Sequence, residues 1–393
     1  MNSEYQRAKN FKIAWVGTFM AGMAFSEAMP FLALYIMQLG QYTDTQVSFY
    51  AGISYAASYF IVILVSPIWG WLADKFGRKP MLIRTAFGMG IVIILISTAT
   101  HLWQIIVLRL IQGFFDGYTP SAIALIASET SVDKRASVIS KLSTGYIIGG
   151  LLGPVVGGIL ATVFSIRMTF TMTGIILLLV GGLSYFGIQE KFQKQEKITI
   201  KKDKKLSIVT GQLLILLMTV MTIQLVESLI TPYIGLMVKK MIVSTHDVMM
   251  GAGIISALPG VATAIFSVFI GKLGDKFGSR KVLMVAEGSA IVIYFVLGMV
   301  HSLIIFAVLR FLTGISNAAL TPSVQVLLSK TSDRISTVFS ISLSAQSFGS
   351  LLGSILGAFL TQYISFTTLF LLASVFFLVN FIILRKFKFA IKS

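Results

Sequence analysis

The chain has 393 residues, of which 56% are hydrophobic and 12% are charged, and its mean hydropathy is +0.88. A soluble domain carries about a quarter charged residues, so this composition excludes an ordinary soluble protein and indicates a chain embedded in lipid. The formal net charge is +17 and there is no cysteine, which excludes a disulfide framework and a thiolate metal site.

Twelve apolar runs follow one another along the chain, and each is long enough to cross a bilayer, which takes roughly 20 residues. The first is too long for the core of a signal peptide, so we expect it to be retained as a helix. The sequence therefore predicts an all-α membrane protein with twelve transmembrane helices. We expect them at residues 11–38, 46–70, 81–99, 102–127, 138–162, 168–187, 207–237, 247–270, 282–300, 303–329, 337–362 and 366–384.

Lysine and arginine gather on one side of this arrangement. With the N-terminus inside, 27 of the 32 fall in segments assigned to the cytoplasm. This positive-inside bias places both termini in the cytoplasm. The basic excess then needs no nucleic-acid partner. We expect a multi-pass protein of a bacterial plasma membrane.

The only long polar stretch is residues 188–206, which contain seven lysines. We expect a solvated cytoplasmic linker there, joining an N-terminal six-helix bundle at 1–187 to a C-terminal six-helix bundle at 207–393. Contact of the lysines with lipid headgroups is the alternative.

A charged turn occurs twice, 201 residues apart. Residues 70–79 read GWLADKFGRK and residues 271–280 read GKLGDKFGSR. Arg109 returns as Arg310 at the same offset. A repeat of about 200 residues in an apolar chain indicates one membrane unit used twice, the plan of a transporter whose halves rock around a central site. The candidate gate residues on the cytoplasmic side are Gly70, Asp74, Gly77, Arg78, Lys79 and Asp275.

Ionisable residues inside the hydrocarbon are costly, so they are the first candidates for function. Four acids lie inside the predicted spans, away from loops and helix ends: Glu27, Asp116, Glu227 and Glu287. A carboxyl group in a low-dielectric cavity can hold a proton near neutral pH and release it, or exchange it for a cationic ligand. The alternative for each is a buried acid satisfied by a neighbouring hydroxyl. For Glu287, near the cytoplasmic end of its span, we expect a structural or interfacial role.

Glu27 and Glu227 each precede a proline in the first span of their half. They are 200 residues apart, which predicts nearly corresponding positions, whereas Pro30 and Pro232 are 202 apart and leave the register open. We expect Glu227 and Asp116 to carry protons and Glu27 to attract the charge of a substrate.

Arg109, Gln112, Gly113 and Asp116 are spaced to share one face of the span at 102–127. The matching face of the span at 303–329 carries Arg310, Thr313, Gly314 and Asn317, without an acid. An arginine in this position can act on a nearby carboxylate. It can also be structural, bonded to backbone carbonyls.

The span at 138–162 carries Gly149, Gly153, Pro154, Gly157 and Gly158. Small residues four apart let helices approach closely, and the proline permits a bend. The span at 337–362 repeats the glycines as Gly349, Gly353 and Gly357, with Ser354 in place of the proline. We therefore expect a hinge in the first half and packing alone in the second.

A few side chains near the acids are candidates for the wall of a substrate cavity, where aromatic rings would suit a flat organic cation. They are Phe31, Tyr35, Phe115, Tyr118, Gln224 and Tyr233.

These motifs, in this order, resemble those of the major facilitator superfamily. Residues 70–79 match its signature for the loop between helices 2 and 3, Arg109 lies where its helix-4 arginine does, and residues 153–158 match its helix-5 antiporter motif. More closely, residues 15–36, 66–92 and 142–161 resemble the MdtG-type branch of drug/proton antiporters. Ser279, in place of an arginine, departs from the signature in its second copy.

The resemblance implies proton-driven efflux of lipophilic, cationic, amphipathic molecules by alternating access. It implies no cofactor, and we expect a monomer. A dedicated metabolite or sugar exporter is the alternative. An intramembrane enzyme would need a nucleophile–base pair or a metal cluster, and the three histidines, His101, His246 and His301, all fall in external loops. A channel is disfavoured by the repeat and the hinge motif.

Overall fold

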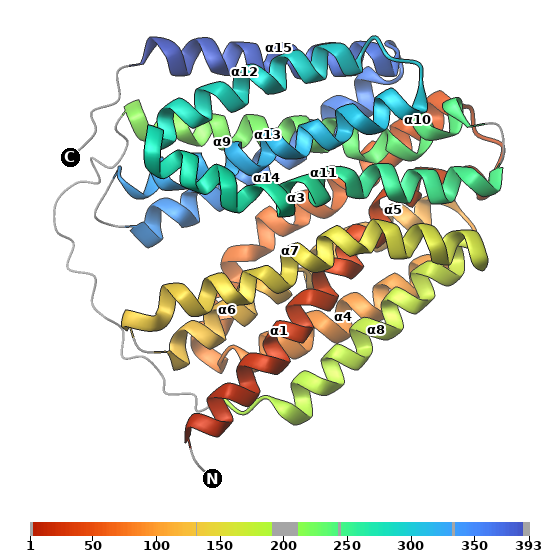
Figure 1. The fold of residues 1–393 in the computed structure, drawn as a ribbon. Helices are drawn as coiled ribbons and strands as arrows, with labels where there is room; N and C mark the ends of the chain where they lie inside the picture. The colour runs from red at the N-terminus through yellow and green to blue at the C-terminus, as the bar shows by residue number, and fades with distance from the viewer. Residues whose placement is uncertain (1–2, 131, 191–210, 243–244, 332–334, 388–393) are drawn as a thin grey trace. The chain divides into compact units, whose positions relative to one another are not determined.

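A computed structural model describes residues 3–130, 132–190, 211–242, 245–331 and 335–387, and every regular element in these ranges is a helix (Figure 1). Helices satisfy their backbone hydrogen bonds internally, as a segment in lipid must. The predicted all-α membrane fold is confirmed.

The first half of the chain contains α1 (Ser3–Ala28), the short 3₁₀ helix η1 (Met29–Phe31), α2 (Leu32–Gln38), α3 (Asp44–Phe76), α4 (Lys79–Ser97), α5 (Leu102–Phe115), α6 (Tyr118–Glu129), α7 (Val132–Val163) and α8 (Ile166–Gly187). The second half contains α9 (Gly211–Ile230), η2 (Thr231–Tyr233), α10 (Ile234–Met241), α11 (Thr245–Phe277), α12 (Ser279–Leu297), α13 (Leu303–Ser329), α14 (Ile335–Leu360) and α15 (Phe366–Lys386).

Among the described residues, nine helices are long and apolar enough to cross a membrane, and α1 with α2 forms a tenth candidate bent by 50°. The two other predicted spans correspond to shorter or more charged helices. The run at 102–127 is divided between α5 and α6, and the run at 282–300 lies mostly on α12. Every predicted apolar run thus contains a helix.

Both halves interrupt their first span in the same way, at the 3₁₀ helices η1 and η2. Each contains a proline, Pro30 or Pro232, which lacks the N–H that a continuous α-helix needs. The span at 102–127 is also broken. Asp116 has an extended backbone (φ −61°, ψ 157°) and Gly117 has a φ of +119°, a left-handed conformation that favours glycine. In the second half α13 runs without a break through Asn317, the residue that corresponds to Asp116.

The chain forms two compact units, and each includes a piece of the opposite half. Unit 1 comprises residues 1–41, 60–201 and 249–257, so it includes one stretch of α11. Unit 2 comprises residues 42–59, 202–248 and 258–393, so it includes the first part of α3. Of the predicted linker at 188–206, only residues 188–190 are described, and the rest lies outside the described residues.

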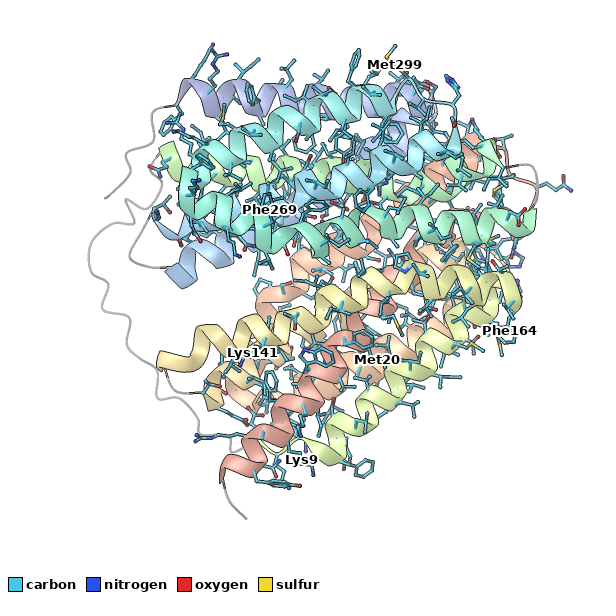
Figure 2. The ribbon with its side chains drawn as sticks, viewed as in Figure 1. Lys9, Met20, Lys141, Phe164, Phe269 and Met299 are labelled. Carbon is cyan, nitrogen blue, oxygen red and sulfur yellow. The ribbon has the colours of Figure 1, made fainter. Side chains whose placement is uncertain are left out.

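Each unit has a buried interior and an apolar exterior. In unit 1, Leu82, Ala122, Leu125 and Leu142 are fully buried in one cluster. On the outside, Phe164, Phe269 and Met299 are each more than half exposed, and Figure 2 labels them among the projecting side chains. Large exposed apolar side chains on long apolar helices are what a lipid-facing surface requires.

Candidate functional site

In unit 1, the glycines of α7 form a row against α1. A Cβ atom at Gly157 would lie 2.7 Å from Cγ of Glu27 and 2.8 Å from the ring of Phe31. Gly149 and Gly153 meet the backbone of α1 two turns and one turn before Glu27, at Phe19 and Met23 respectively. The absence of side chains lets the two helices approach closely. The helix-5 motif therefore places its glycines directly against Glu27.

The other side of α7 packs on the stretch of α11 that belongs to unit 1. A Cβ atom at Gly158 would lie 3.2 Å from the Cα of Gly253, and the carbonyl of Pro154 also lies against Gly253. Pro154 is inside α7, which continues from Val132 to Val163. The residues of the motif thus pack against two helices of unit 1, α1 on one side of α7 and α11 on the other.

The same arrangement recurs in unit 2, where the glycines of α14 form a row against α9. Gly349 faces Met221, Gly353 faces Leu225, and Gly357 faces Leu229 and Tyr233. The glycines are offset by 200 residues from those of α7, but their partners are offset by 202 residues, as in Phe19 and Met221. The prolines have this same offset.

The packing therefore corrects the expected correspondence of the two acids. At an offset of 202, Glu27 corresponds to Leu229 and Phe31 to Tyr233, while Glu227 corresponds to Phe25. A shift of two residues turns a side chain by about 200° around a helix. Glu27 and Glu227 consequently lie on different faces of their helices.

Glu27 is fully buried, with 0% of its surface exposed. Neither of its carboxyl oxygens makes a hydrogen bond to a described residue. Thr173 of α8 lies beside it, but that hydroxyl donates to the carbonyl of Thr169 at 2.8 Å. A buried ionised carboxylate is very costly without hydrogen bonds or a paired charge. This environment favours the neutral, protonated side chain.

Arg109 is also buried, and its Nη1 donates to Oε1 of Gln112 at 2.8 Å. The two side chains line a small cavity together with Phe25 of α1. Since Phe25 corresponds to Glu227, the acid that faces the arginine in the second half is replaced by a phenyl ring in the first.

Asp116 does not continue the helical face of Arg109 and Gln112, because α5 ends before it. This corrects the predicted shared face. Its Oδ1 instead accepts a hydrogen bond from the N–H of Gly117 at 2.6 Å and so stabilises the break.

Arg84 of α4 faces this break. Its Nη2 donates to the carbonyl of Asp116 at 3.2 Å, and its guanidinium lies 3.5 Å from the ring centroid of Trp69. Trp69 in turn donates its Nε1–H to the carbonyl of Phe114 at 2.9 Å. An arginine over an indole face is a favourable cation–π contact. The break is therefore held by two side chains from neighbouring helices.

Glu227 of α9 is exposed, in contrast to Glu27. Arg310 of α13 and Tyr294 of α12 lie close enough to interact with it electrostatically, and both are buried. Nε of Arg310 has no hydrogen-bond partner among the described residues. The three side chains form one acid–base cluster in unit 2.

Glu287 belongs to a separate buried cluster in unit 2. Nδ2 of Asn380 donates to its Oε1 and also to Oγ1 of Thr219, the latter at 3.1 Å. All three residues are buried and come from α12, α15 and α9. The amide of Asn380 thus links the three helices, and Oε2 of Glu287 has no hydrogen-bond partner among the described residues. This geometry favours a structural role for the cluster.

The charged turn of the first half is held by an acid that lies far away in sequence. Glu190 accepts hydrogen bonds from the backbone N–H of Arg78 and of Lys79, at 2.8–2.9 Å. A carboxylate at the start of a helix interacts favourably with the helix dipole. The side chain of Asp74 lies outside the described residues, while Gly70 is open and Asp275 is exposed.

A second contact ties the end of α6 to the start of α1. Nδ2 of the buried Asn10 donates to both carboxyl oxygens of Glu129, at 2.9 and 3.0 Å, and to the carbonyl of Gln189 at 2.8 Å. Burial raises the pKa of Glu129, and the nearby Glu190 raises it further, whereas the bond from Asn10 and the charge of Arg7 lower it. Glu129 lies beyond the predicted span at 102–127.

The candidate cavity aromatics are used mostly for packing. Tyr35 is fully buried and its hydroxyl donates to carbonyls at the end of α4, including that of Ile96 at 2.9 Å. Tyr118 is buried with its hydroxyl 3.0 Å from Oγ of Ser184, and Phe115 packs on Gly88. Gln224 is half-buried, with its Oε1 3.5 Å from Oγ of Ser350.

These networks also contain side chains that were not predicted as site residues: Asn10, Trp69, Arg84, Glu129, Glu190, Thr219, Tyr294 and Asn380. Arg84 falls inside the predicted span at 81–99, but the charge count assigns it to the cytoplasmic turn before that span, because it lies only five residues after Lys79. Its neighbour Thr85 and the apolar run that follows are the signals that it belongs to the helix. Glu190 lies near the start of the polar stretch. No residue close to it in the sequence indicates that it binds the backbone of Arg78 and Lys79.

Comparison with known proteins places this arrangement in a family. The model of the Major Facilitator Superfamily matches residues 14–242 and 216–390. The chain belongs to the major facilitator superfamily. It is 35% identical over 377 residues to the "Multidrug resistance protein MdtG" of Escherichia coli strain K12 / DH10B, covering 93% of this chain and 91% of the relative. The same protein of E. coli strain SMS-3-5 / SECEC is equally similar.

Solved structures of this superfamily have the same fold. A mutant form of the nucleoside transporter NupG superposes with a TM-score of 0.77 at 14% identity, covering 97% of this chain and 99% of that one. A bacterial homologue of the human lysosomal transporter Spinster, in an inward-facing and unoccupied conformation, has a TM-score of 0.76 at 15% identity, covering 98% and 97%. At these identities the likeness shows the fold alone. The family model and the similarity to MdtG make the chain a multi-span transporter of this superfamily.

Proposed function

We propose that the protein exports lipophilic, cationic drugs across the bacterial plasma membrane in exchange for protons, by alternating access and without a cofactor. The similarity to MdtG over nearly the whole chain supports a multidrug substrate range. Glycines of the helix-5 antiporter motif, packed against α1, support exchange rather than symport.

The observation that carries proton coupling is the environment of Glu27. This carboxyl group is fully buried, makes no hydrogen bond to a described residue, and lies against Gly157 of the motif. A carboxyl group in such a place holds its proton while it stays buried, because the ionised form needs polar contacts. Proton release therefore requires that the contact between α1 and α7 change. This links the proton to the conformation of the transporter.

Burial also suggests that the expected roles of the acids are exchanged. Glu27 suits the proton, and the exposed Glu227 suits the positive charge of a substrate. Arg310 beside Glu227 would neutralise its charge when no substrate is bound. Asp116, whose carboxylate is bonded to the N–H of Gly117, would act mainly on the shape of its helix.

The test is efflux by the purified protein in proteoliposomes with an imposed pH gradient. Ethidium and tetraphenylphosphonium represent lipophilic cations, a neutral lipophilic dye represents uncharged drugs, and lactose represents sugars. We expect Glu27→Gln to lose pH-driven efflux of every drug while it still binds ethidium. Glu227→Gln should lose the cations and keep the neutral dye, because an amide carries no charge to attract them.

Asp44→Asn is the matched control, since Asp44 is an exposed acid at the start of α3. It should transport like the unmodified protein. Proton-driven transport at normal rates by Glu27→Gln would contradict the coupling role. Transport of lactose in place of the drugs would favour the sugar exporter.

A further inference from the structure

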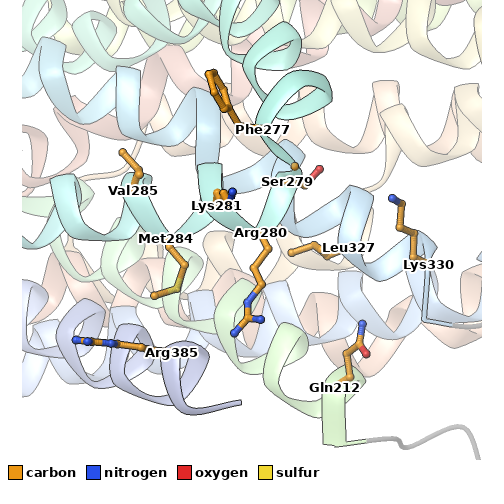
Figure 3. Close-up of a pocket in the computed structure, with 11 residues that line it drawn as sticks. Gln212, Phe277, Ser279, Arg280, Lys281, Met284, Val285, Leu327, Lys330 and Arg385 are labelled. Carbon is orange, nitrogen blue, oxygen red and sulfur yellow. The ribbon is translucent and has the colours of Figure 1, made fainter. Parts of the chain in front are cut away.

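A cavity of about 710 Å³ lies at one end of unit 2 (Figure 3). Its lining comes from the turn between α11 and α12 and from the adjoining ends of α9, α13 and α15. The lining residues are Gln212, Phe277, Gly278, Ser279, Arg280, Lys281, Met284, Val285, Leu327, Lys330 and Arg385. The volume is typical of a small-molecule site.

The charge of this lining is of one sign. Arg280, Lys281, Lys330 and Arg385 are basic, and none of the eleven lining residues is acidic. Arg280 is fixed in place, because its Nη2 donates to the carbonyl of Phe387 at 2.7 Å. Lys281, Lys330 and Arg385 are exposed. Like charges gathered around one cavity repel one another unless an anion lies among them.

Four of the other lining residues are apolar, and some of these are open to the outside of the unit. Val285 is 73% exposed and Phe277 is 51% exposed, and Met284 and Leu327 lie beside the basic groups. Exposed apolar residues on a membrane helix contact acyl chains. The lining therefore combines basic groups with apolar side chains of a lipid-facing surface. Arg385 lies on the side of Met284 and Val285, and Lys330 lies on the other side of Arg280 (Figure 3).

The corresponding turn of unit 1 already holds an anion. There the carboxylate of Glu190 accepts the N–H groups of Arg78 and Lys79 at the start of α4. At the start of α12 the N-cap residue is Gly278, which has no side chain to cap the helix, and Gly278 and Ser279 line the cavity. The residue 201 positions after Glu190 is Ile391, which has no charge. The second half thus repeats the turn without the acid.

We propose that this cavity binds the headgroup of an anionic phospholipid, with the acyl chains lying along Met284 and Val285. The phosphate would occupy the place at the start of α12 that Glu190 occupies at the start of α4, beside Lys281, with Lys330 and Arg385 on its two sides. Basic pockets between membrane helices bind such headgroups, and basic side chains near a membrane surface strengthen the attraction. Residues 191–210 contain seven lysines and two acids, so the linker sequence offers little opposite charge.

The test is native mass spectrometry of the full chain, purified in detergent and titrated with dioleoylphosphatidylglycerol or with dioleoylphosphatidylcholine. We expect the anionic lipid to bind more tightly. A triple variant, Lys281→Gln, Lys330→Gln and Arg385→Gln, should weaken its binding by about tenfold or more, given the attraction of each basic residue. The conservative variant Lys281→Arg, Lys330→Arg and Arg385→Lys should retain binding.

The matched control removes the same charge from unit 1, as Lys9→Gln, Lys12→Gln and Lys141→Gln. It should bind the anionic lipid normally. An equal loss in this control, or an unchanged affinity in the first triple variant, would overturn the proposal. Competition by soluble glycerol 3-phosphate at the lipid's own concentration would assign the cavity to a soluble anion instead. Drug transport is not the readout, so the result is independent of the proposed export function.

Discussion

The contact of α1 with α7 and the contact of α9 with α14 are the same packing with different chemistry. In both, three glycines four residues apart meet the backbone of the first helix, and an aromatic ring follows the proline. In unit 1 the last of the three glycines, Gly157, packs against the buried Glu27. In unit 2 the last one, Gly357, packs against Leu229. The repeat has kept the shape of the contact while the position of the acid has changed. The acids, not the glycines, therefore distinguish the two units.

The largest expected effect tests the shared packing. Gly153→Leu would place a side chain against the backbone of α1, and Gly353→Leu would do so against α9. We expect each to lower the free energy of unfolding by about 3 kcal/mol or more, because there is no space for the added atoms. The measurement is thermal unfolding in detergent, followed by circular dichroism.

Gly150→Leu is the control, since Gly150 has no heavy atom within 4 Å of its Cβ position. It should unfold like the unmodified protein. If Gly353→Leu were tolerated and Gly153→Leu were not, the helix-5 motif would have a hinge role beyond packing.

The second prediction replaces Glu27 of unit 1 by leucine, the residue at the corresponding position 229 of unit 2. Glu27→Leu should raise the free energy of unfolding by about 1–4 kcal/mol, because it replaces a buried polar group without hydrogen bonds by an apolar one. It should also abolish pH-driven efflux. The same thermal unfolding measures the first effect. A destabilised variant would mean that the carboxyl group has partners in the folded protein.

The third prediction concerns the arginines. A double-mutant cycle of Glu227→Gln and Arg310→Gln should give a coupling energy of about 0.2–1 kcal/mol, because the two groups interact electrostatically and solvent screens the exposed Glu227. The cycle of Glu27→Gln and Arg109→Gln should give less, since Phe25 and not Glu27 lies with Arg109 in the small cavity. Equal coupling energies in the two cycles would mean that the acid and the arginine interact equally strongly in both units, which would contradict this prediction.

The smallest effect is the pH dependence of stability that Glu129 of unit 1 contributes. Since the pKa of Glu129 is raised in the folded protein, the native state binds the proton more tightly than the unfolded chain does. Stability should fall as the pH rises from about 4.3, the ordinary value for glutamate, through the raised value. Glu129→Gln should make the melting temperature less dependent on pH over this range. A slope that persists unchanged would assign the dependence to other groups.

The fold could be predicted from the sequence because hydropathy alone marks a membrane helix. Each apolar run became a helix, and Pro30 and Pro232 coincide with interruptions of the first span in each half. The break at Asp116 and Gly117 was not predicted. A glycine within an apolar run is tolerated in a helix, and the contacts of Arg84 and Trp69 that hold the break come from other helices.

The candidate site was predictable in its residue types and not in its register. Offsets of 200, 201 and 202 residues coexist between the halves, and only the contacts of α7 and α14 decide that 202 applies to the first helix. The role of Glu190 likewise could not be predicted from the sequence. Its partners lie more than 100 residues away, so no local pattern distinguishes it from a solvated linker residue.

Trp69 gives the protein a built-in optical probe. The chain has four tryptophans, and this one lies under the guanidinium of Arg84 while its indole N–H is bonded to the last turn of α5. The emission of an indole depends on the charge and hydrogen bonds around it. In a variant with Trp15, Trp71 and Trp103 replaced by phenylalanine, all tryptophan fluorescence comes from Trp69. Its emission wavelength would report changes at the break between α5 and α6 during the transport cycle, without any added label.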